Sequence, residues 1–180
     1  MKLVSTASPQ FIETRFSRQI GCHLAERFPT PAHKEATFAV PCIDGRWPLL
    51  LVIFAVRRVV RKMFGRSDMF MQSAPGGGLI FLRDDDRRAG VIASYRDACG
   101  IAKVPSGELP ITPVLHLDCG RHGGICSDVG TGYCDQVDHL TNHAHKIIST
   151  LRALFPNLPP VVVVIVDPRG WVVGKIVEER

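Results

Sequence analysis

Two short motifs hold the residues of this chain that are best suited to bind a metal. The first is the pentapeptide Cys42–Arg46 (CIDGR), and the second is the tetrapeptide His116–Cys119 (HLDC). Two thiolates and one imidazole are ligands that zinc prefers, and three protein ligands leave its fourth position open for water. The sequence therefore predicts a zinc site formed by Cys42, His116 and Cys119.

Each motif follows a stretch that is typical of a buried strand. The segment Thr37–Pro41 precedes the first motif, and the segment Ile111–Leu115 precedes the second. Both are rich in apolar and β-branched residues, as buried strands are. In open α/β sheets, ligands and metals gather where the strands end at their carboxyl edge. We therefore expect both motifs to meet at one edge of a sheet.

Two kinds of zinc site are compatible with these ligands. In a catalytic site, Asp44 and Arg46 would surround the metal and orient its bound water. In a closed structural site, a further side chain would take the fourth position and the metal would be inert. The chain offers several candidates for that fourth ligand: Cys126, Cys134, His122, His139 and His143. We favour the catalytic interpretation, because a purely structural zinc has no use for Asp44 and Arg46.

The two motifs resemble the signatures of the β-class carbonic anhydrases, which read C-x-D-x-R and H-x-x-C. Both stand in the family's order here, and the resemblance extends from about Pro31 to the C-terminus. The segments Asp68–Phe70 and Ser73–Gly77 look like the strand and glycine turn between the two signatures. The ending Val161–Val177 looks like the closing hairpin of the family. Either signature alone occurs by chance in many chains, whereas the pair is a specific signal.

The resemblance implies a function as well as a fold. It implies a carbonic anhydrase-like lyase in which Cys42, His116 and Cys119 bind zinc and a zinc-bound hydroxide converts carbon dioxide reversibly to bicarbonate. Asp44, oriented by Arg46, would accept a hydrogen bond from the bound water. In another arrangement known in the family, this Asp ligates zinc directly and closes the site, and the sequence does not choose between the two. The resemblance also implies a homodimer or a higher homo-oligomer.

Two other functions remain compatible with the same residues. The scaffold could hydrolyse a related small molecule, carbonyl sulfide or carbon disulfide. Alternatively, the chain could be a non-catalytic structural zinc protein whose basic helix binds a partner. The basic residues lie in the segment Pro48–Arg66, where they alternate with apolar residues at helical spacing. We interpret them as a solvated helix face and do not expect nucleic acid as a partner.

Composition favours a single globular domain. The chain has 180 residues, of which 46% are hydrophobic and 22% charged, with a formal net charge of +5. One domain over 1–180, with an N-terminal helical arm at 1–30, fits this length. The start of the chain lacks the apolar core of a signal peptide, and no apolar run is long enough to cross a membrane. We therefore expect a cytoplasmic protein that does not enter the membrane.

Hydrophobic periodicity predicts alternating strands and helices. We expect helices at about 48–64, 84–99 and 137–154, and strands ending at Cys42, Ser73 and His116, with a turn at Gly76–Gly78. A final hairpin is expected to turn at Asp167–Gly170. The pattern predicts an α/β fold: a mostly parallel central sheet with a C-terminal antiparallel hairpin strand and helices on both faces.

Overall fold

The structure is a computed structural model that describes residues 36–43, 49–65, 68–119, 133–167 and 171–178. These residues all belong to one compact unit, His33–Arg180. The expected N-terminal helical arm lies outside the described residues, as do Asp44 and Arg46. Within the described part of the chain, no helix is long and apolar enough to span a membrane.

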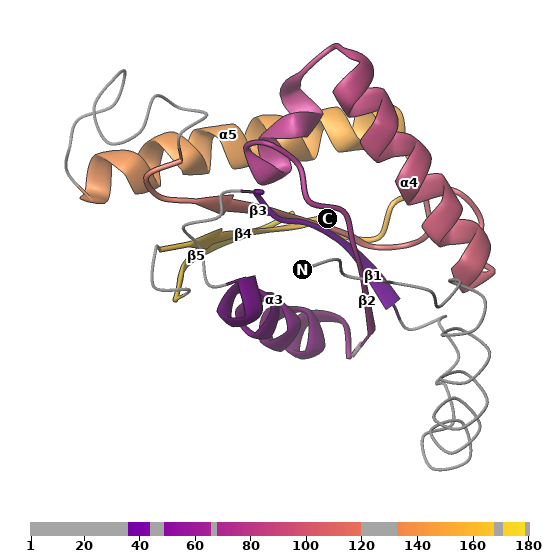
Figure 1. The fold of residues 1–180 in the computed structure, drawn as a ribbon, viewed down its shortest axis with the longest axis horizontal. Helices are drawn as coiled ribbons and strands as arrows, with labels where there is room; N and C mark the ends of the chain where they lie inside the picture. Colours follow the sequence, from indigo (N-terminus) through magenta and orange to yellow (C-terminus); the bar gives the residue numbers. More distant parts are fainter. Residues whose placement is uncertain (1–35, 44–48, 66–67, 120–132, 168–170, 179–180) are drawn as a thin grey trace, which may run out of the picture. The chain divides into compact units, whose positions relative to one another are not determined.

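A five-stranded sheet forms the centre of the unit (Figure 1). Its strands, in sequence order, are β1 (Ala36–Val40), β2 (Asp68–Met71), β3 (Ile111–His116), β4 (Val162–Val166) and β5 (Val172–Val177). They lie in the order β2-β1-β3-β4-β5, and only the β4–β5 pair is antiparallel. All residues of β1, β3 and β4 are buried, as expected of parallel strands that are covered on both faces. The predicted α/β fold is confirmed.

Helix α3 (Leu49–Phe64) covers one face of the sheet (Figure 1). Val52, Val56 and Val60 follow one another at one-turn spacing and are buried in a cluster with valines of β3 and β4. Its basic residues Arg57, Arg58, Arg61 and Lys62 are exposed, which confirms the solvated face expected from the sequence. The apolar half of the helix is not buried all round, because the Phe54 side chain is 64% exposed.

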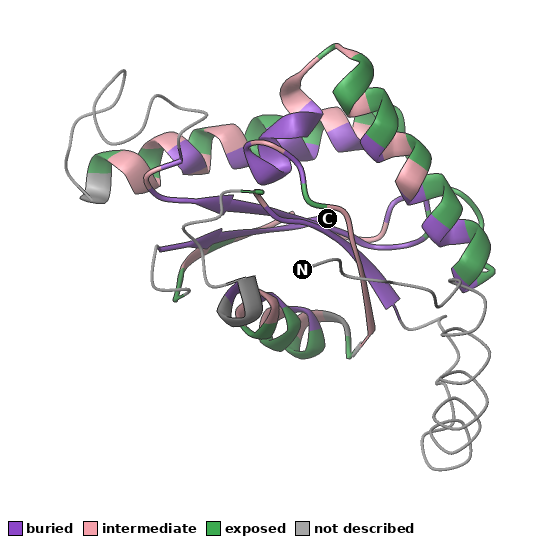
Figure 2. Cartoon of the chain, in the orientation of Figure 1, coloured by how far each residue is buried: buried purple, intermediate pink, exposed green. Residues whose placement is uncertain are grey.

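The other face of the sheet is covered by α4 (Asp86–Ala102), α5 (Tyr133–Leu154) and a short 3-10 helix, η3 (Gly77–Leu82). The larger hydrophobic core lies on this side, and Figure 2 shows buried residues in each of these elements. Tyr95 of α4 is fully buried at its centre, where its hydroxyl donates to the Leu109 carbonyl at 2.9 Å. The sequence predicted α4 and α5 but not η3.

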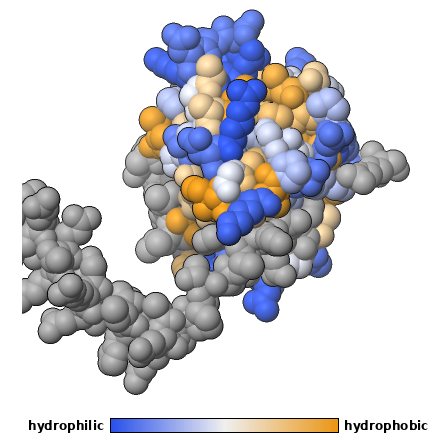
Figure 3. Space-filling view, turned by 90° about the vertical axis from the view of Figure 1, so that its right-hand side faces the viewer, coloured by the Kyte–Doolittle hydropathy of each residue, from blue (hydrophilic) through white to orange (hydrophobic). Residues whose placement is uncertain are grey.

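Helix α4 begins and ends with recognisable capping residues. The Asp85 side chain accepts hydrogen bonds from the backbone N–H groups of Arg87 and Arg88, which are among the donors that a helix start leaves free. Lys103 ends the helix in the left-handed conformation, with φ of 55°. Figure 3 shows hydrophilic residues gathered at the top of the view, where Figure 1 places the start of α4.

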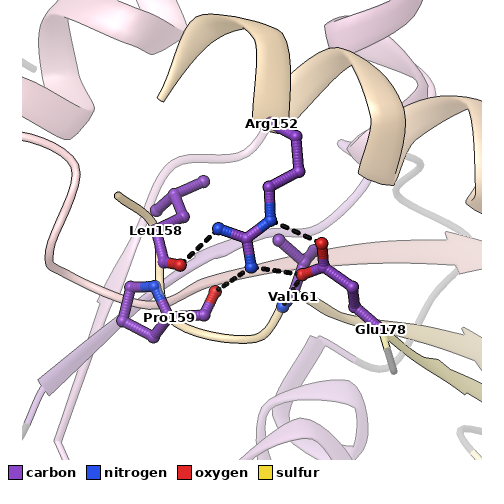
Figure 4. A network of polar contacts seen from close by, with 5 residues as sticks. All are labelled: Arg152, Leu158, Pro159, Val161 and Glu178. Atoms are coloured by element: carbon purple, nitrogen blue, oxygen red, sulfur yellow. Dashed lines mark hydrogen bonds and ion pairs between the residues drawn. The ribbon is translucent and has the colours of Figure 1, made fainter. Parts of the chain in front are cut away.

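A polar network ties the end of α5 to the end of the last strand (Figure 4). The Arg152 guanidinium forms a bidentate ion pair with Glu178, and it also donates to the carbonyls of Leu158 and Pro159. The Glu178 carboxylate accepts in addition from the Val161 N–H, at 3.2 Å. The hydrogen bonds from Arg152 to Glu178 raise the pKa of Arg152 above its ordinary value. The network joins α5, β5 and the start of β4.

Candidate metal centre

The register of the sheet brings the two sequence motifs together. Strands β1 and β3 are parallel, with Phe38 opposite Ile111 and Val40 opposite Pro113. Continued two residues past Val40, this register places Cys42 beside the end of β3, where His116 lies. The expected meeting at one edge of the sheet is therefore confirmed for Cys42 and His116, and this edge is the carboxyl edge of β1 and β3.

The ligand atoms of Cys42, His116 and Cys119 lie within 4.8 Å of one another. In a tetrahedral zinc site, sulfur and nitrogen ligands are about 3.5–3.8 Å apart. Shifts of about 1 Å or less would therefore bring the three ligand atoms to the spacing that zinc requires. The His116 and Cys119 side chains are buried, and Cys42 is half-buried. Two soft thiolates and one imidazole in such a cluster are the donor set of a zinc site, and the three residues fit that metal.

The imidazole of His116 is oriented by the backbone next to it. Its Nδ1 atom lies 2.8 Å from the Leu117 carbonyl oxygen. Because a carbonyl only accepts, Nδ1 carries the ring proton in this contact, and Nε2 keeps the lone pair that a metal needs. Such a hydrogen bond from the second ring nitrogen fixes the tautomer and the orientation of a histidine ligand.

The backbone reverses between His116 and Cys119. Asp118 has φ of 54°, a left-handed conformation that Asp adopts more readily than most residues. Its N–H donates to the side-chain oxygen of Gln136 on α5, at 2.9 Å. Gln136 thus supports the turn that brings Cys119 back toward His116. This role of Gln136 was not predicted from the sequence, because nothing in a glutamine at the start of a helix indicates which turn it supports.

The three glycines Gly76–Gly78 pack against the same edge. The Gly76 N–H donates to the Cys42 sulfur at 3.3 Å. A Cβ on Gly77 would lie 2.3 Å from the Val114 carbonyl oxygen and 2.9 Å from the Cys42 nitrogen, so no larger residue fits there. From the sequence, these glycines were expected only to form a turn. Their close approach to β3, and the hydrogen bond to a ligand sulfur, explain why glycine is needed.

The remaining candidate ligands behave differently. His139 and His143 are not part of the cluster, and they contact one another on α5 instead. Both are half-buried. Cys99 is buried in the core, whereas Cys22 lies outside the described residues. The described residues do not include Cys126, His122 or the side chain of Cys134.

Fold and site together define an α/β protein with a candidate three-ligand metal centre at the carboxyl edge of its sheet. No family model matches the chain, and no curated protein does. Among solved structures, the chain is similar to the β-carbonic anhydrase CafA of the fungal pathogen Aspergillus fumigatus, at 13% identity and a TM-score of 0.39. That match covers 94% of this chain and 86% of the other. At this TM-score the likeness carries no argument, and the case for the site stands on its residues.

Proposed function

We propose that the protein is a zinc enzyme that hydrates carbon dioxide reversibly to bicarbonate. The observation that carries this proposal is the cluster of Cys42, His116 and Cys119, with ligand atoms within 4.8 Å of one another at the carboxyl edge of the sheet. The two motifs that resemble the β-class carbonic anhydrase signatures supply these residues. The resemblance supports the choice of reaction, and the geometry supports the choice of metal ligands.

Each residue of the cluster has a separate task in this proposal. Cys42 and Cys119 bind zinc as thiolates, and His116 binds it through Nε2 while Nδ1 donates to the Leu117 carbonyl. Bound zinc supplies the acidity that ionises a water near neutral pH. The N–H of Gly76, donating to the Cys42 sulfur, draws charge from that thiolate. The exposed Ile43, which follows the half-buried Cys42, marks the side of the site that is nearer to solvent.

Asp44 and Arg46 complete the proposal as catalytic residues. Asp44 would accept a hydrogen bond from the reacting water, and Arg46 would hold the carboxylate in place. Asp44→Ala should then retain zinc and lose most hydration activity, because the metal ligands are intact while the water is misoriented. If Asp44 instead closes the site as a fourth ligand, the wild type should be nearly inactive at neutral pH and gain activity as the pH rises. Unchanged hydration by Asp44→Ala at every pH would remove these two residues from the mechanism.

The substrate is tested on one preparation with a measured zinc content. Stopped-flow assays with carbon dioxide, carbonyl sulfide and carbon disulfide compare the three small molecules under the same conditions. Zinc-dependent hydration of carbon dioxide supports the proposal. Turnover of only a sulfur-containing substrate would reassign the same site to a hydrolase. Full zinc with no turnover of any of them would favour the structural zinc protein with a basic, partner-binding helix.

The proposal includes a homodimer in the cytoplasm as the working form. Two features of the described residues support the dimer: the Phe54 side chain on α3 is 64% exposed, and β5 lies at an end of the strand order. An exposed large apolar side chain and a strand at the edge of a sheet are both suited to pairing with a second copy. Light scattering at micromolar concentration should give a mass of two chains. A mass of one chain would contradict the dimer and leave the zinc site unaffected.

A further inference from the structure

We propose that His139 and His143 form a second metal site, which binds a divalent transition-metal ion independently of the thiolate cluster. The two histidines lie one turn apart on α5. Their Nε2 atoms are 3.1 Å apart, and their ring centroids are 4.5 Å apart at an interplanar angle of 79°. The same nitrogen of each ring therefore already lies close to its counterpart on the other ring.

This geometry is close to that of a two-histidine chelate. Zinc lies about 2.0–2.1 Å from an imidazole nitrogen, so two nitrogens in a tetrahedral shell are about 3.3 Å apart. The observed 3.1 Å between the Nε2 atoms needs only a small opening of the pair. Histidines four residues apart on a helix are also the spacing by which helical metal sites hold an ion. No change of the backbone is needed to admit the metal.

The surroundings of the pair favour the neutral form of His143. His139 and His143 are half-buried beside Leu140 and Ala144, which face the core. Burial lowers the pKa of His143, and the neighbouring His139 and Lys146 lower it further. A neutral ring offers a lone pair at neutral pH, which is the form that binds metals. In the present contact, one ring donates its Nε2 proton to the other. Binding requires that this proton move through solvent to Nδ1 of its own ring, so that both Nε2 atoms face the ion.

The donor type defines the class of ion. Imidazole suits zinc, nickel and copper, whereas calcium and magnesium require oxygen ligands. Two protein ligands leave the other positions to water, so this ion should exchange more readily than one held by Cys42, His116 and Cys119. Asp135, one turn before His139, is exposed and adds negative charge along the same row of α5. The thiolate cluster does not include either histidine, so the two sites are separate.

The proposed site lies close along the helix to a residue of the metal centre. Gln136, which accepts the Asp118 N–H beside Cys119, comes three residues before His139 on α5. An ion that links His139 to His143 joins two successive turns of this helix. It should therefore stabilise the part of α5 that carries Gln136.

The experiment uses the full chain, loaded with zinc and freed of excess metal, at neutral pH. Nickel is then titrated by calorimetry, and the zinc content is measured before and after. We expect the wild type to bind one nickel ion that His139→Ala and His143→Ala each weaken by at least about tenfold, since even an outer-sphere change costs metal sites that much. His145→Ala is the matched control, because His145 is exposed on the same helix, and it should bind nickel as the wild type does.

The outcomes separate the two proposals. Nickel binding that both ligand variants retain, or a wild type that binds no nickel, would overturn the second site. Circular dichroism establishes whether each variant is folded. If either His139→Ala or His143→Ala fails to fold, nickel binding is compared between the wild type and the other variant. Failure of the zinc enzyme proposal would appear instead as absent zinc or absent turnover in His145→Ala and the wild type alike. The loss of nickel binding in His139→Ala and His143→Ala, relative to His145→Ala, does not depend on that result.

Discussion

The two ends of the sheet carry two polar centres of opposite character. At the end where β4 begins, Arg152 meets the Glu178 carboxylate and two backbone carbonyls, so cationic donors are matched by acceptors from the chain itself. At the end where β1 and β3 finish, Cys42, His116 and Cys119 gather three electron-pair donors within 4.8 Å. A network of donors and acceptors is complete within the protein. A cluster of candidate metal-ligand atoms could hold a cation.

We call the network of Arg152 and Glu178 the stabilising centre. Its matched ion pairs and hydrogen bonds connect α5 to the last two strands and need nothing from outside the chain. The group of Cys42, His116 and Cys119 is the candidate metal centre, where a bound metal would add to the stability of the folded state. We therefore expect substitutions at Arg152 or Glu178 to change mainly the free energy of unfolding. Substitutions at Cys42, His116 or Cys119 should change the metal content.

The largest expected effect is the loss of zinc when one ligand is removed. Cys42→Ala, His116→Ala and Cys119→Ala should each lack the stoichiometric zinc that the wild type retains after dialysis, because two remaining ligands hold zinc far more weakly. Each should also unfold at a lower temperature, since bound metal stabilises the folded state. Metal analysis by mass spectrometry together with thermal unfolding measures both effects.

Other cysteines serve as controls for this prediction. Cys99→Ala removes a buried thiol of the core and should keep its zinc. Cys126→Ser and Cys134→Ser should keep zinc as well, and its loss from either would favour the closed structural site. Full zinc in Cys42→Ala would show that the cluster is not the metal centre.

The proximity of Cys42, His116 and Cys119 could be predicted from the sequence because motif and strand pattern agree. Residue types and apolar runs place Cys42 and His116 at strand ends, and parallel strands bring such ends to a common edge. Contacts that depend on tertiary packing could not be predicted. The N–H of Gly76 meets the Cys42 sulfur, and Gln136 accepts from Asp118, through the packing of η3 and α5 on the sheet. Neither contact leaves a periodic signal in the chain.

The second prediction concerns the stabilising centre. Arg152→Ala should lower the free energy of unfolding by about 2 kcal/mol, because the mostly buried Glu178 carboxylate loses its charged hydrogen bonds. Zinc content should not change. Chemical denaturation of the zinc-loaded protein measures the loss. Arg88→Ala is the matched control, since its pair with Asp84 is largely exposed and should contribute only about 0.3–0.5 kcal/mol. Equal losses in the two variants would contradict the assignment of Arg152 as a stabilising centre.

The smallest expected effect lies at Gln136, where structure and function overlap. Gln136→Leu removes the acceptor of the Asp118 N–H, which supports the left-handed turn between His116 and Cys119. Zinc should still bind at one ion per chain, but with an affinity about tenfold lower, as is typical when a ligand loses its support. Competition with a zinc chelator measures this change. Gln136→Glu keeps a side-chain oxygen at the same position and should bind zinc nearly as the wild type does. If Gln136→Leu binds zinc as tightly as the wild type, Gln136 does not help to position Cys119, and the turn at Asp118 forms without this hydrogen bond.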